Sequence, residues 1–202
     1  MTYLYAILVG FAAGSIPFGY LIGHFVFRAD IREKGSGNIG AMNALRSFGK
    51  AGAAAVLVLD ALKGFVPALL AMLFYDETVA SVAAIASVLG HCFSPWLRWR
   101  GGKGVATSFG AIFALSPYAG LVAVLGWAAG ALTTGYSSVG SLFGSLLAPV
   151  ALFLFSGGST AEILYGILVL ALIVFTHREN IARLRENTEN PIQLRRESDG
   201  GS

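Results

Sequence analysis

The sequence predicts an all-α protein that crosses a membrane seven times as a helical bundle. Hydrophobic residues make up 55% of the 202 residues and charged residues only 12%, and the mean hydropathy is +0.70. These values are typical of integral membrane proteins and exclude an ordinary soluble domain. Several charge-poor runs are long enough for the roughly 20 apolar residues that a spanning helix needs. They lack the period-two alternation of barrel strands, so we expect helices.

The spans follow one another in order along the chain. The run 3–27 predicts the first span, and the runs 51–75 and 78–97 predict the next two. The run 105–176 carries a single formal charge, Glu162. Pro117 and the turn-like segments 133–138 and 156–159 divide this run into helices at 105–116, 117–134, 138–155 and 160–176. The first of these four is short, and we expect it to be kinked or only partly embedded.

The basic residues set the number and direction of the spans. All lysines and arginines except Lys63 lie in three segments, 28–50, 98–103 and 178–196. The positive-inside rule places these three segments in the cytoplasm. An even number of spans must then separate the second segment from the third, which favours four helices over three in the run 105–176. The result is seven spans, with the N-terminus outside and the C-terminus cytoplasmic.

We expect residues 1–197 to form one membrane-embedded domain and Ser198–Ser202 to form a disordered tail. The net charge of +3 comes from the cytoplasmic loops and fits anionic lipid at least as well as nucleic acid. Membrane lipids, and no nucleic acid, are therefore the expected partners. Cys92 is the only cysteine, which excludes an intrachain disulfide and a multi-cysteine metal site. No metal and no cofactor are expected.

The segment Gly35-Ser36-Gly37-Asn38-Ile39-Gly40-Ala41-Met42-Asn43 combines glycines with polar donors just beyond the first span. It formally matches G-x-G-x-x-G, but a dinucleotide site needs a preceding strand, and here a membrane span precedes. Its glycines allow close backbone approach, and successive amide groups can form a nest that binds an anion. Arg46 follows on a helix that we expect to begin near Ala41. The alternative is a flexible turn, which would not need Asn38, Asn43 and Arg46 together.

The segment Gly101-Gly102-Lys103-Gly104 opens the helix predicted from residue 105. It is not a P-loop, because Gly104 stands where that motif needs serine or threonine. A lysine framed by glycines at a helix N-terminus nevertheless suits phosphate, and Thr107 could add a hydroxyl group. The alternative is a membrane-interface anchor, for which Trp96, Trp99, Arg98 and Arg100 are typical. Both roles can hold together.

The segment His177-Arg178-Glu179-Asn180 follows the last span directly. On a continuing helix, His177 and Asn180 would share a face. A histidine beside a carboxylate can serve as a base, an orienting donor or a metal ligand. The alternative is a simple interfacial cap. We expect Arg178 and Arg183 to contact lipid phosphates.

Asp60 and Lys63 lie in the middle of the second span, at a spacing that permits an ion pair on one helix face. Ionisable groups inside a membrane are costly and favour a functional role. Structural support and direct contact with a site both remain open, with Gly64 and Pro67 expected to shape a kink. We interpret Cys92 as a packing residue, because no third group would orient the neighbouring His91 as its base.

Together these motifs resemble the bacterial acyl-phosphate:glycerol-3-phosphate acyltransferase family over nearly the whole chain. Further stretches that carry the resemblance are Gly14–Gly19, Asp60-x-x-Lys63-Gly64, Gly90–Pro95 and Gly101–Thr107. The resemblance implies a seven-span enzyme of the bacterial inner membrane with its site at the cytoplasmic face. It would transfer a fatty acyl group from acyl phosphate to the 1-position hydroxyl of glycerol 3-phosphate. Lysophosphatidic acid and inorganic phosphate would be the products of this first acylation step of phospholipid synthesis.

The resemblance also implies roles for individual residues. The candidate catalytic residues are Ser36, Lys103, His177 and Asn180. The candidate substrate-binding residues are Arg46, Gly37, Asn38, Gly40, Asn43, Gly101, Gly102, Gly104, Thr107, Ser138, Ser141 and Glu179. The partners implied are acyl phosphate, glycerol 3-phosphate and, by functional coupling, the enzyme that makes acyl phosphate.

The chemistry of such a reaction suits these residues. Acyl phosphate is a mixed anhydride with a good leaving group, so positioning and charge stabilisation can supply most of the catalysis. Two phosphate groups need two cations, which Arg46 and Lys103 provide. We expect His177 to orient the acceptor or to assist proton removal, although a substrate phosphate oxygen could also accept the proton. No Ser-His-Asp arrangement and no H-x-x-x-x-D pattern is evident, which favours direct transfer from acyl phosphate.

The competing class is a membrane transporter of an organic phosphate. Such a protein would be expected to carry inverted repeats and a site near the membrane midplane. The sequence shows no such repeat, and its candidate residues gather at one membrane face.

Overall fold

The computed structural model describes residues 1–192, and all the regular secondary structure in this range is helical. The helices are α1 (Thr2–Ser15), α2 (Phe18–Phe25), α3 (Ala41–Phe74), α4 (Glu77–Cys92), α5 (Val105–Leu115), α6 (Pro117–Thr134), α7 (Ser137–Phe155), α8 (Thr160–Thr176) and α9 (Arg178–Arg185). Short 3₁₀ turns lie at Ile31–Glu33 and Pro95–Leu97. The tail expected at 198–202 lies outside the described residues.

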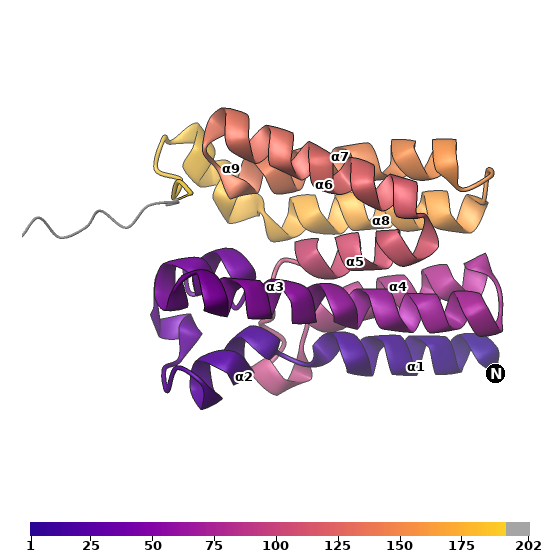
Figure 1. Cartoon of the computed structure of the whole chain (residues 1–202), viewed down its shortest axis with the longest axis horizontal. Helices are drawn as coiled ribbons and strands as arrows, with labels where there is room; N and C mark the ends of the chain where they lie inside the picture. Colours follow the sequence, from indigo (N-terminus) through magenta and orange to yellow (C-terminus); the bar gives the residue numbers. More distant parts are fainter. Residues whose placement is uncertain (193–202) are drawn as a thin grey trace, which may run out of the picture.

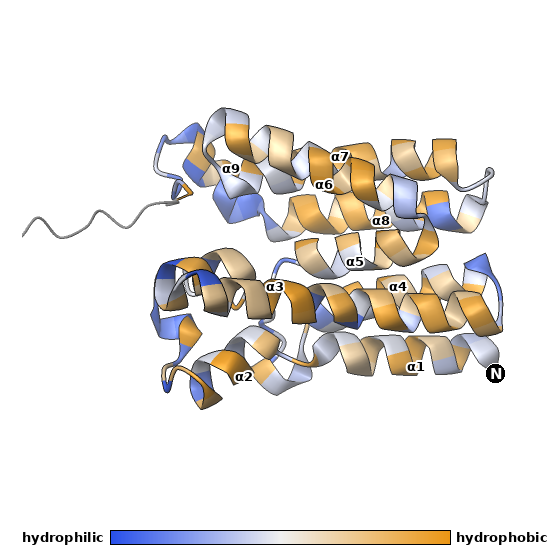
Figure 2. Ribbon diagram, viewed as in Figure 1, coloured by the Kyte–Doolittle hydropathy of each residue, from blue (hydrophilic) through white to orange (hydrophobic). Residues whose placement is uncertain are grey.

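The long helices run side by side along one axis (Figure 1). Helices α1 to α4 form one group and α6 to α8 form another, with α5 between them. Helix α4 packs on α1, α3 and α8, while α5 packs on α3 and α6. Hydrophobic residues cover the helices, and hydrophilic residues gather mainly at the two ends of the bundle (Figure 2).

The four helices predicted in the run 105–176 are confirmed to within a residue or so of their expected ends. Local sequence explains these boundaries. Pro117 occupies the first turn of α6, where its missing N–H costs nothing, and Ser116 precedes it as the cap. Asp76 starts α4 in the same way, because its carboxylate accepts from the amides of Thr78 and Val79 at 2.9 and 2.8 Å.

The number of spans is confirmed only in part. Among the described residues, 5 helical stretches are long and apolar enough to cross a membrane, or 6 if α8 and α9, bent by 57°, count as one. Helix α5 has 11 residues and is therefore about 16 Å long, about half the thickness of a hydrocarbon core. Its residues are mostly buried between the two helix groups. The seventh span is thus not confirmed by helix length.

The first apolar stretch is interrupted where α1 and α2 meet at Pro17. Side chains from distant parts of the chain bind the carbonyl groups near this break. The Ser94 hydroxyl donates to the Ser15 carbonyl at 2.6 Å, and the Lys63 ammonium donates to the Ile16 carbonyl at 2.8 Å. The break is therefore fixed by α3 and by the loop that follows α4.

Asp60 and Lys63 form a buried ion pair with their charged atoms 2.8 Å apart. Both side chains are buried inside the bundle, which fits the interpretation of Asp60 and Lys63 as a structural pair. Pro67 cannot donate to the Lys63 carbonyl one turn earlier, and the Ser87 hydroxyl of α4 donates to it instead at 2.5 Å. The helical dihedral angles of α3 break at Gly49 (φ 76°) and not at the expected Gly64 and Pro67.

Glycines bring α3 and α5 into backbone contact. A Cβ atom on Gly64 would collide with the Thr107 carbonyl oxygen, and one on Gly110 would collide with the carbonyl oxygen of Ala61. Small residues allow such close approach between helices in a membrane. The contact matters for the site, because Lys103 stands just before α5 and is thereby held close to α3.

We expect Lys63→Met to lower the free energy of unfolding by about 3–5 kcal/mol, because Asp60 would stay buried without its cation. The double variant Asp60→Asn, Lys63→Met should recover part of that loss. Thermal unfolding of the purified protein in detergent measures both effects. Lys50→Met is the matched control, since Lys50 is exposed on the same helix. Equal stability of Lys63→Met and Lys50→Met would rule out a structural ion pair.

Candidate active site

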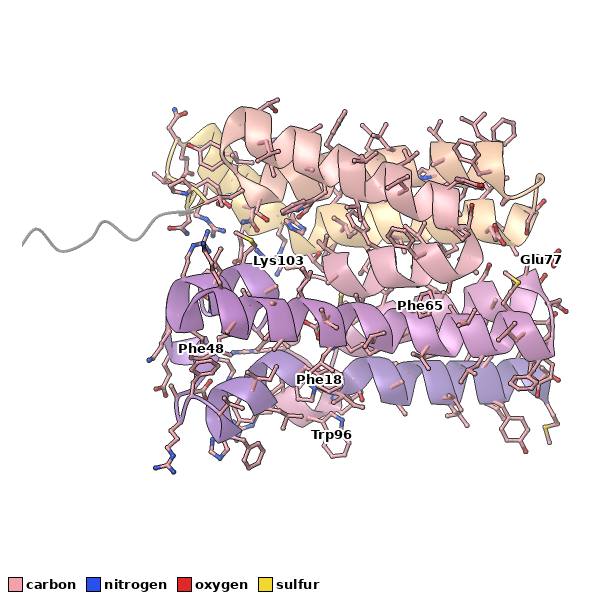
Figure 3. All side chains as sticks on the ribbon, in the orientation of Figure 1. Phe18, Phe48, Phe65, Glu77, Trp96 and Lys103 are labelled. Atoms are coloured by element: carbon pink, nitrogen blue, oxygen red, sulfur yellow. The ribbon has the colours of Figure 1, made fainter. Side chains whose placement is uncertain are left out.

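A cavity of about 560 Å³ lies between α3, α5, α6, α7 and the junction of α8 with α9. Its polar lining consists mainly of Ser36, Asn38, Arg46, Lys103, Ser138, Ser141, His177, Asn180, Arg183, Glu189 and Asn190. Its apolar lining includes Leu57, Phe109, Phe113, Val124 and Trp127, from α3, α5 and α6. Figure 3 shows Lys103 between the two groups of helices. The cavity therefore combines a cationic region with an oily one.

The cavity brings together most of the residues predicted for the site. Those lining it are Ser36, Asn38, Gly40, Asn43, Arg46, Lys103, Gly104, Ser138, Ser141, His177 and Asn180. Gly37, Gly101, Gly102, Thr107 and Glu179 are not among its lining residues. The Thr107 side chain is fully buried beside Gly64, and the Glu179 side chain is 72% exposed. The structure thus places Thr107 and Glu179 away from the cavity lining, and their expected contact with substrate stays a prediction.

The loop before α3 is organised by the side chain of Asn43, which is 2% exposed. Its amide nitrogen donates to the carbonyls of Ile31, Lys34 and Asn38 at 2.8–3.0 Å, and its oxygen accepts from the Ser36 amide at 2.9 Å. The Gly40 amide donates to the Asn38 side chain at 2.8 Å. Several amides of the expected anion nest therefore already have partners inside the loop. What the loop presents to the cavity is the side chains of Ser36 and Asn38 and the start of α3.

The loop before α5 uses its glycines for packing. The amides of Gly101 and Gly102 donate to the carbonyls of Cys92 and His91 at 3.0 and 3.1 Å. A Cβ atom on Gly102 would overlap the His91 ring. The two glycines let the chain return along the end of α4 and deliver Lys103 to the cavity, so they act on the site through the backbone.

Lys103 belongs to a chain of polar groups that reaches across the cavity. Its ammonium group donates to the Asn180 side-chain oxygen, and the Asn180 amide nitrogen donates to Glu189 at 2.6 Å. The Thr176 hydroxyl fixes the backbone by donating to the Lys103 carbonyl at 3.0 Å. Burial and the nearby Arg183 guanidinium lower the pKa of Lys103 to about 8. Lys103 is thus still mainly charged at neutral pH.

His177 lies at the bend between α8 and α9 and is 3% exposed. Its Nδ1 is 2.9 Å from the Ile173 carbonyl oxygen, which can only accept, so we assign the ring hydrogen to Nδ1. Nε2 is then a hydrogen-bond acceptor. Burial and the nearby Lys103 ammonium lower the pKa of His177 to about 4, and the ring is therefore neutral at physiological pH.

The segment after α9 folds back over the cationic region. Arg183, for which we expected a contact with lipid phosphate, pairs with Glu189 at 2.8 Å and lines the cavity. The Arg46 guanidinium donates to the carbonyls of Asn190 and Pro191 at 3.4 and 3.3 Å. The Ile192 amide donates to the Gly135 carbonyl at 2.8 Å, so the segment also reaches the turn between α6 and α7.

Sequence reasoning missed several residues of the cavity. Glu189 and Asn190 stand in a polar stretch without a recognisable motif, and only the folded chain brings them to the site. His91 also lines the cavity, as does Asp60, for which the sequence had left contact with a site open. Their position inside predicted spans was a usable signal, because ionisable groups there favour a functional interpretation.

Comparison with known proteins identifies the family. A family model described as glycerol-3-phosphate acyltransferase matches residues 4–187. The glycerol-3-phosphate acyltransferase of Pelagibacter ubique is 40% identical over 194 residues, which cover 96% of this chain and 100% of the relative. That of Roseobacter denitrificans is 44% identical over 187 residues, 92% of each chain.

Two crystal structures of PlsY, an integral membrane glycerol 3-phosphate acyltransferase, are similar to this protein in fold and 37% identical to it in sequence. Its glycerol 3-phosphate form has a TM-score of 0.90 and covers 96% of both chains. Its lysophosphatidic acid form has a TM-score of 0.87 and covers 95% of both chains. The fold is therefore that of a multi-pass integral membrane acyltransferase. The chain belongs to the glycerol-3-phosphate acyltransferase family, as the sequence motifs predicted.

Proposed function

We propose that this protein transfers a fatty acyl group from acyl phosphate to the 1-position hydroxyl of glycerol 3-phosphate, releasing lysophosphatidic acid and inorganic phosphate. The observation that carries the proposal is the cavity with cationic and apolar lining. Acyl phosphate and lysophosphatidic acid are both amphiphiles with a phosphate at one end. The relatives are glycerol-3-phosphate acyltransferases, and the two PlsY structures are its glycerol 3-phosphate and lysophosphatidic acid forms. Both findings support glycerol 3-phosphate as the acceptor and lysophosphatidic acid as the product.

The two ends of the cavity suit the two ends of such a substrate. The lining contains three cationic side chains, those of Arg46, Lys103 and Arg183. It contains two carboxylates, Glu189 and Asp60, and Asp60 is already paired with Lys63. Arg46 and Leu57 lie on α3 on opposite sides of its break at Gly49, and the lining around Leu57 is mainly apolar. An acyl chain would lie along Leu57, Phe113 and Trp127 while the phosphate groups lie near Lys103 and Arg46.

The proposed reaction is a direct acyl transfer. The 1-hydroxyl oxygen of glycerol 3-phosphate attacks the carbonyl carbon of acyl phosphate and forms the ester bond. The bond between that carbon and the bridging phosphate oxygen breaks, and the electron pair leaves with phosphate. The hydroxyl proton passes to a phosphate oxygen, so inorganic phosphate leaves and no group remains on the protein. Lys103 and Arg46 stabilise the charge on the phosphates throughout.

His177 fits the role of an acceptor that orients the attacking hydroxyl. Its Nε2 can accept a hydrogen bond, because Nδ1 is held by the Ile173 carbonyl. A histidine with a pKa of about 4 is a weak base at neutral pH. This supports a substrate phosphate oxygen as the final proton acceptor, with His177 aligning the hydroxyl lone pair.

We further propose the bacterial inner membrane as the location, with the polar end of the cavity at the cytoplasmic face. Glu77 lies at the same end of the bundle as the N-terminus (Figures 1 and 3). Helix α9 and the basic loop that precedes α3 lie at the opposite end. The positive-inside rule makes that opposite end cytoplasmic and the N-terminus external. The proposal of seven spans counts α1 with α2 as a single span, ends the last span with α8, and includes the short α5. Glycerol 3-phosphate would enter from the cytoplasm, and acyl phosphate would come from the enzyme that makes it.

We expect purified protein to form lysophosphatidic acid from glycerol 3-phosphate with acyl phosphate and not with acyl-CoA. Mass spectrometry of the lipid product measures both donors in parallel. Product from acyl-CoA alone would overturn the proposed donor. Uptake of glycerol 3-phosphate into sealed vesicles without chemical change would favour a transporter instead.

Replacing Lys103 should weaken catalysis strongly and change its pH dependence. We expect Lys103→Met to lower kcat/KM by about 10²–10³-fold, the usual cost of losing a charge-stabilising donor. Wild-type activity should fall as the pH rises through about 8, where Lys103 loses its proton. Lys103→Arg should be weaker than wild type but keep its activity in that range, because guanidinium stays charged. If the activity of Lys103→Arg fell at the same alkaline pH as that of wild type, a group other than Lys103 would control this loss of activity.

His177→Ala should lower kcat by about 10²-fold or more, because the attacking hydroxyl loses its orienting acceptor. In the pH profile of kcat, protonation of His177 should lower activity near pH 4 and not near 6.5, since burial and Lys103 disfavour its protonation. His24→Ala is the control, as His24 is exposed and distant from the cavity lining. Near-normal turnover of His177→Ala would remove His177 from the reaction.

A further inference from the structure

One buried carboxylate, Glu189, gathers polar groups from two helices at the site. Its Oε1 accepts from the Asn180 amide at 2.6 Å and from the Ser138 hydroxyl at 2.9 Å. Its Oε2 accepts from Arg183 Nε at 2.8 Å. Burial raises the pKa of the Glu189 carboxyl, but the hydrogen bonds from Asn180, Arg183 and Ser138 outweigh this effect and leave the pKa below its usual value. Glu189 is therefore an anion at the edge of the cavity.

Glu189 determines which way the Asn180 amide faces. An asparagine amide fits its surroundings in two orientations that differ only in the places of oxygen and nitrogen. A carboxylate can only accept hydrogen bonds and an ammonium can only donate them. With its nitrogen bound to Glu189, Asn180 must turn its oxygen toward Lys103. The reverse orientation would set donor against donor at Lys103 and acceptor against acceptor at Glu189.

We propose that Glu189 is a positioning residue of the active site, which fixes the Asn180 amide and thereby holds the Lys103 ammonium in place. The role assigned to Lys103 in this step rests on the proposed function. Glu189 itself makes no contact with the reacting atoms. Its three donors offset its charge, so it need not repel a phosphate bound by Lys103 and Arg46.

The folded-back segment gives Glu189 a fixed position. Arg46 donates to the carbonyls of Asn190 and Pro191, and the Ile192 amide donates to the Gly135 carbonyl. The segment that follows Glu189 is thus bound to α3 and to the turn between α6 and α7, and it holds the carboxylate between α7 and α9. The Glu189 side chain is 5% exposed, so its hydrogen bonds are little weakened by competing water.

Steady-state kinetics of variants tests the proposal. Glu189→Ala should lower kcat/KM by about 10–100-fold, the range for losing a hydrogen bond to a charged group. Glu189→Gln should lose less, because its carbonyl oxygen can still accept from Asn180 and Ser138 while only the Arg183 contact is lost. Glu186→Ala is the matched control, because Glu186 is an exposed glutamate three residues earlier in the chain. Glu189→Leu, close in size but without an acceptor, replaces Glu189→Ala if that variant does not fold.

A double-mutant cycle separates positioning from a simple structural tether. If Glu189 acts through Asn180, Glu189→Ala in the Asn180→Ala background should cause little further loss of kcat/KM. Losses that simply add would overturn the proposal. So would equal activity of Glu189→Ala, Glu186→Ala and wild type.

A second readout does not need the reaction at all. The chain has only 4 lysines, Lys34, Lys50, Lys63 and Lys103, so acetylation of Lys103 by acetic anhydride can be measured against exposed Lys34 and Lys50 by mass spectrometry. Lys103 is surrounded by the charges of Arg46, Arg183, Glu179 and Glu189, with neutral His177 beside it. Removing Glu189 frees the ammonium and favours its neutral form, so the relative acetylation of Lys103 in Glu189→Ala should rise several-fold at a pH near 8.

The two readouts distinguish this inference from the proposed function. An inactive wild-type protein would contradict the proposed reaction, while the acetylation experiment would still decide whether Glu189 positions Lys103. An active wild type with unchanged acetylation of Lys103 in Glu189→Ala would overturn the positioning role and leave the reaction standing.

Discussion

The structure depends on one constraint: a backbone polar group inside the bundle must find its partner within the protein, because lipid offers none. The constraint explains contacts that span long distances in sequence. Ser94 and Lys63 bind the carbonyls exposed at the break before α2, and Ser87 binds the carbonyl that Pro67 leaves free in α3. These two irregularities are thus tied to other parts of the bundle. The same bonds that satisfy the backbone also fix the relative positions of α1, α3 and α4, on which the cavity is built.

In the cavity, the charges of the side chains do not cancel. Asp60 and Lys63 cancel one another deep in the bundle, and Asn43 satisfies its own loop. At the polar end, however, Arg46, Lys103 and Arg183 face the carboxylate of Glu189. A surplus of positive charge remains in a partly buried space beside apolar walls. An anion with a hydrocarbon chain would complete both halves of this environment, which supports the proposed acyl phosphate donor over a free polar phosphate.

The sequence predicts the elements well and their mutual arrangement poorly, for physical reasons. Pro117 and the turn segments are local signals, so the helices between 105 and 176 are predicted nearly residue by residue. The burial of α5 depends on glycine contacts with α3, which no local pattern reveals. The same holds for the site: the motifs identify Lys103 and His177, but whether a motif residue faces the cavity or packs behind it, as Thr107 does, is decided by the neighbouring helix. Glu189 lies beyond the last motif and reaches the site only through the fold of its segment.

The electrostatic state of the site constrains the mechanism that it can support. Burial and the Lys103 ammonium keep His177 neutral, with its pKa near 4, while the pKa of Lys103 near 8 leaves that group mainly charged at neutral pH. The two protonation states are consistent with one another, since a charge on Lys103 disfavours a charge on His177. A site of this kind can hold anions firmly and align a hydroxyl group, but it provides no strong base. Such a site suits a substrate with an already activated acyl group, in which the leaving phosphate can take the proton that the histidine does not.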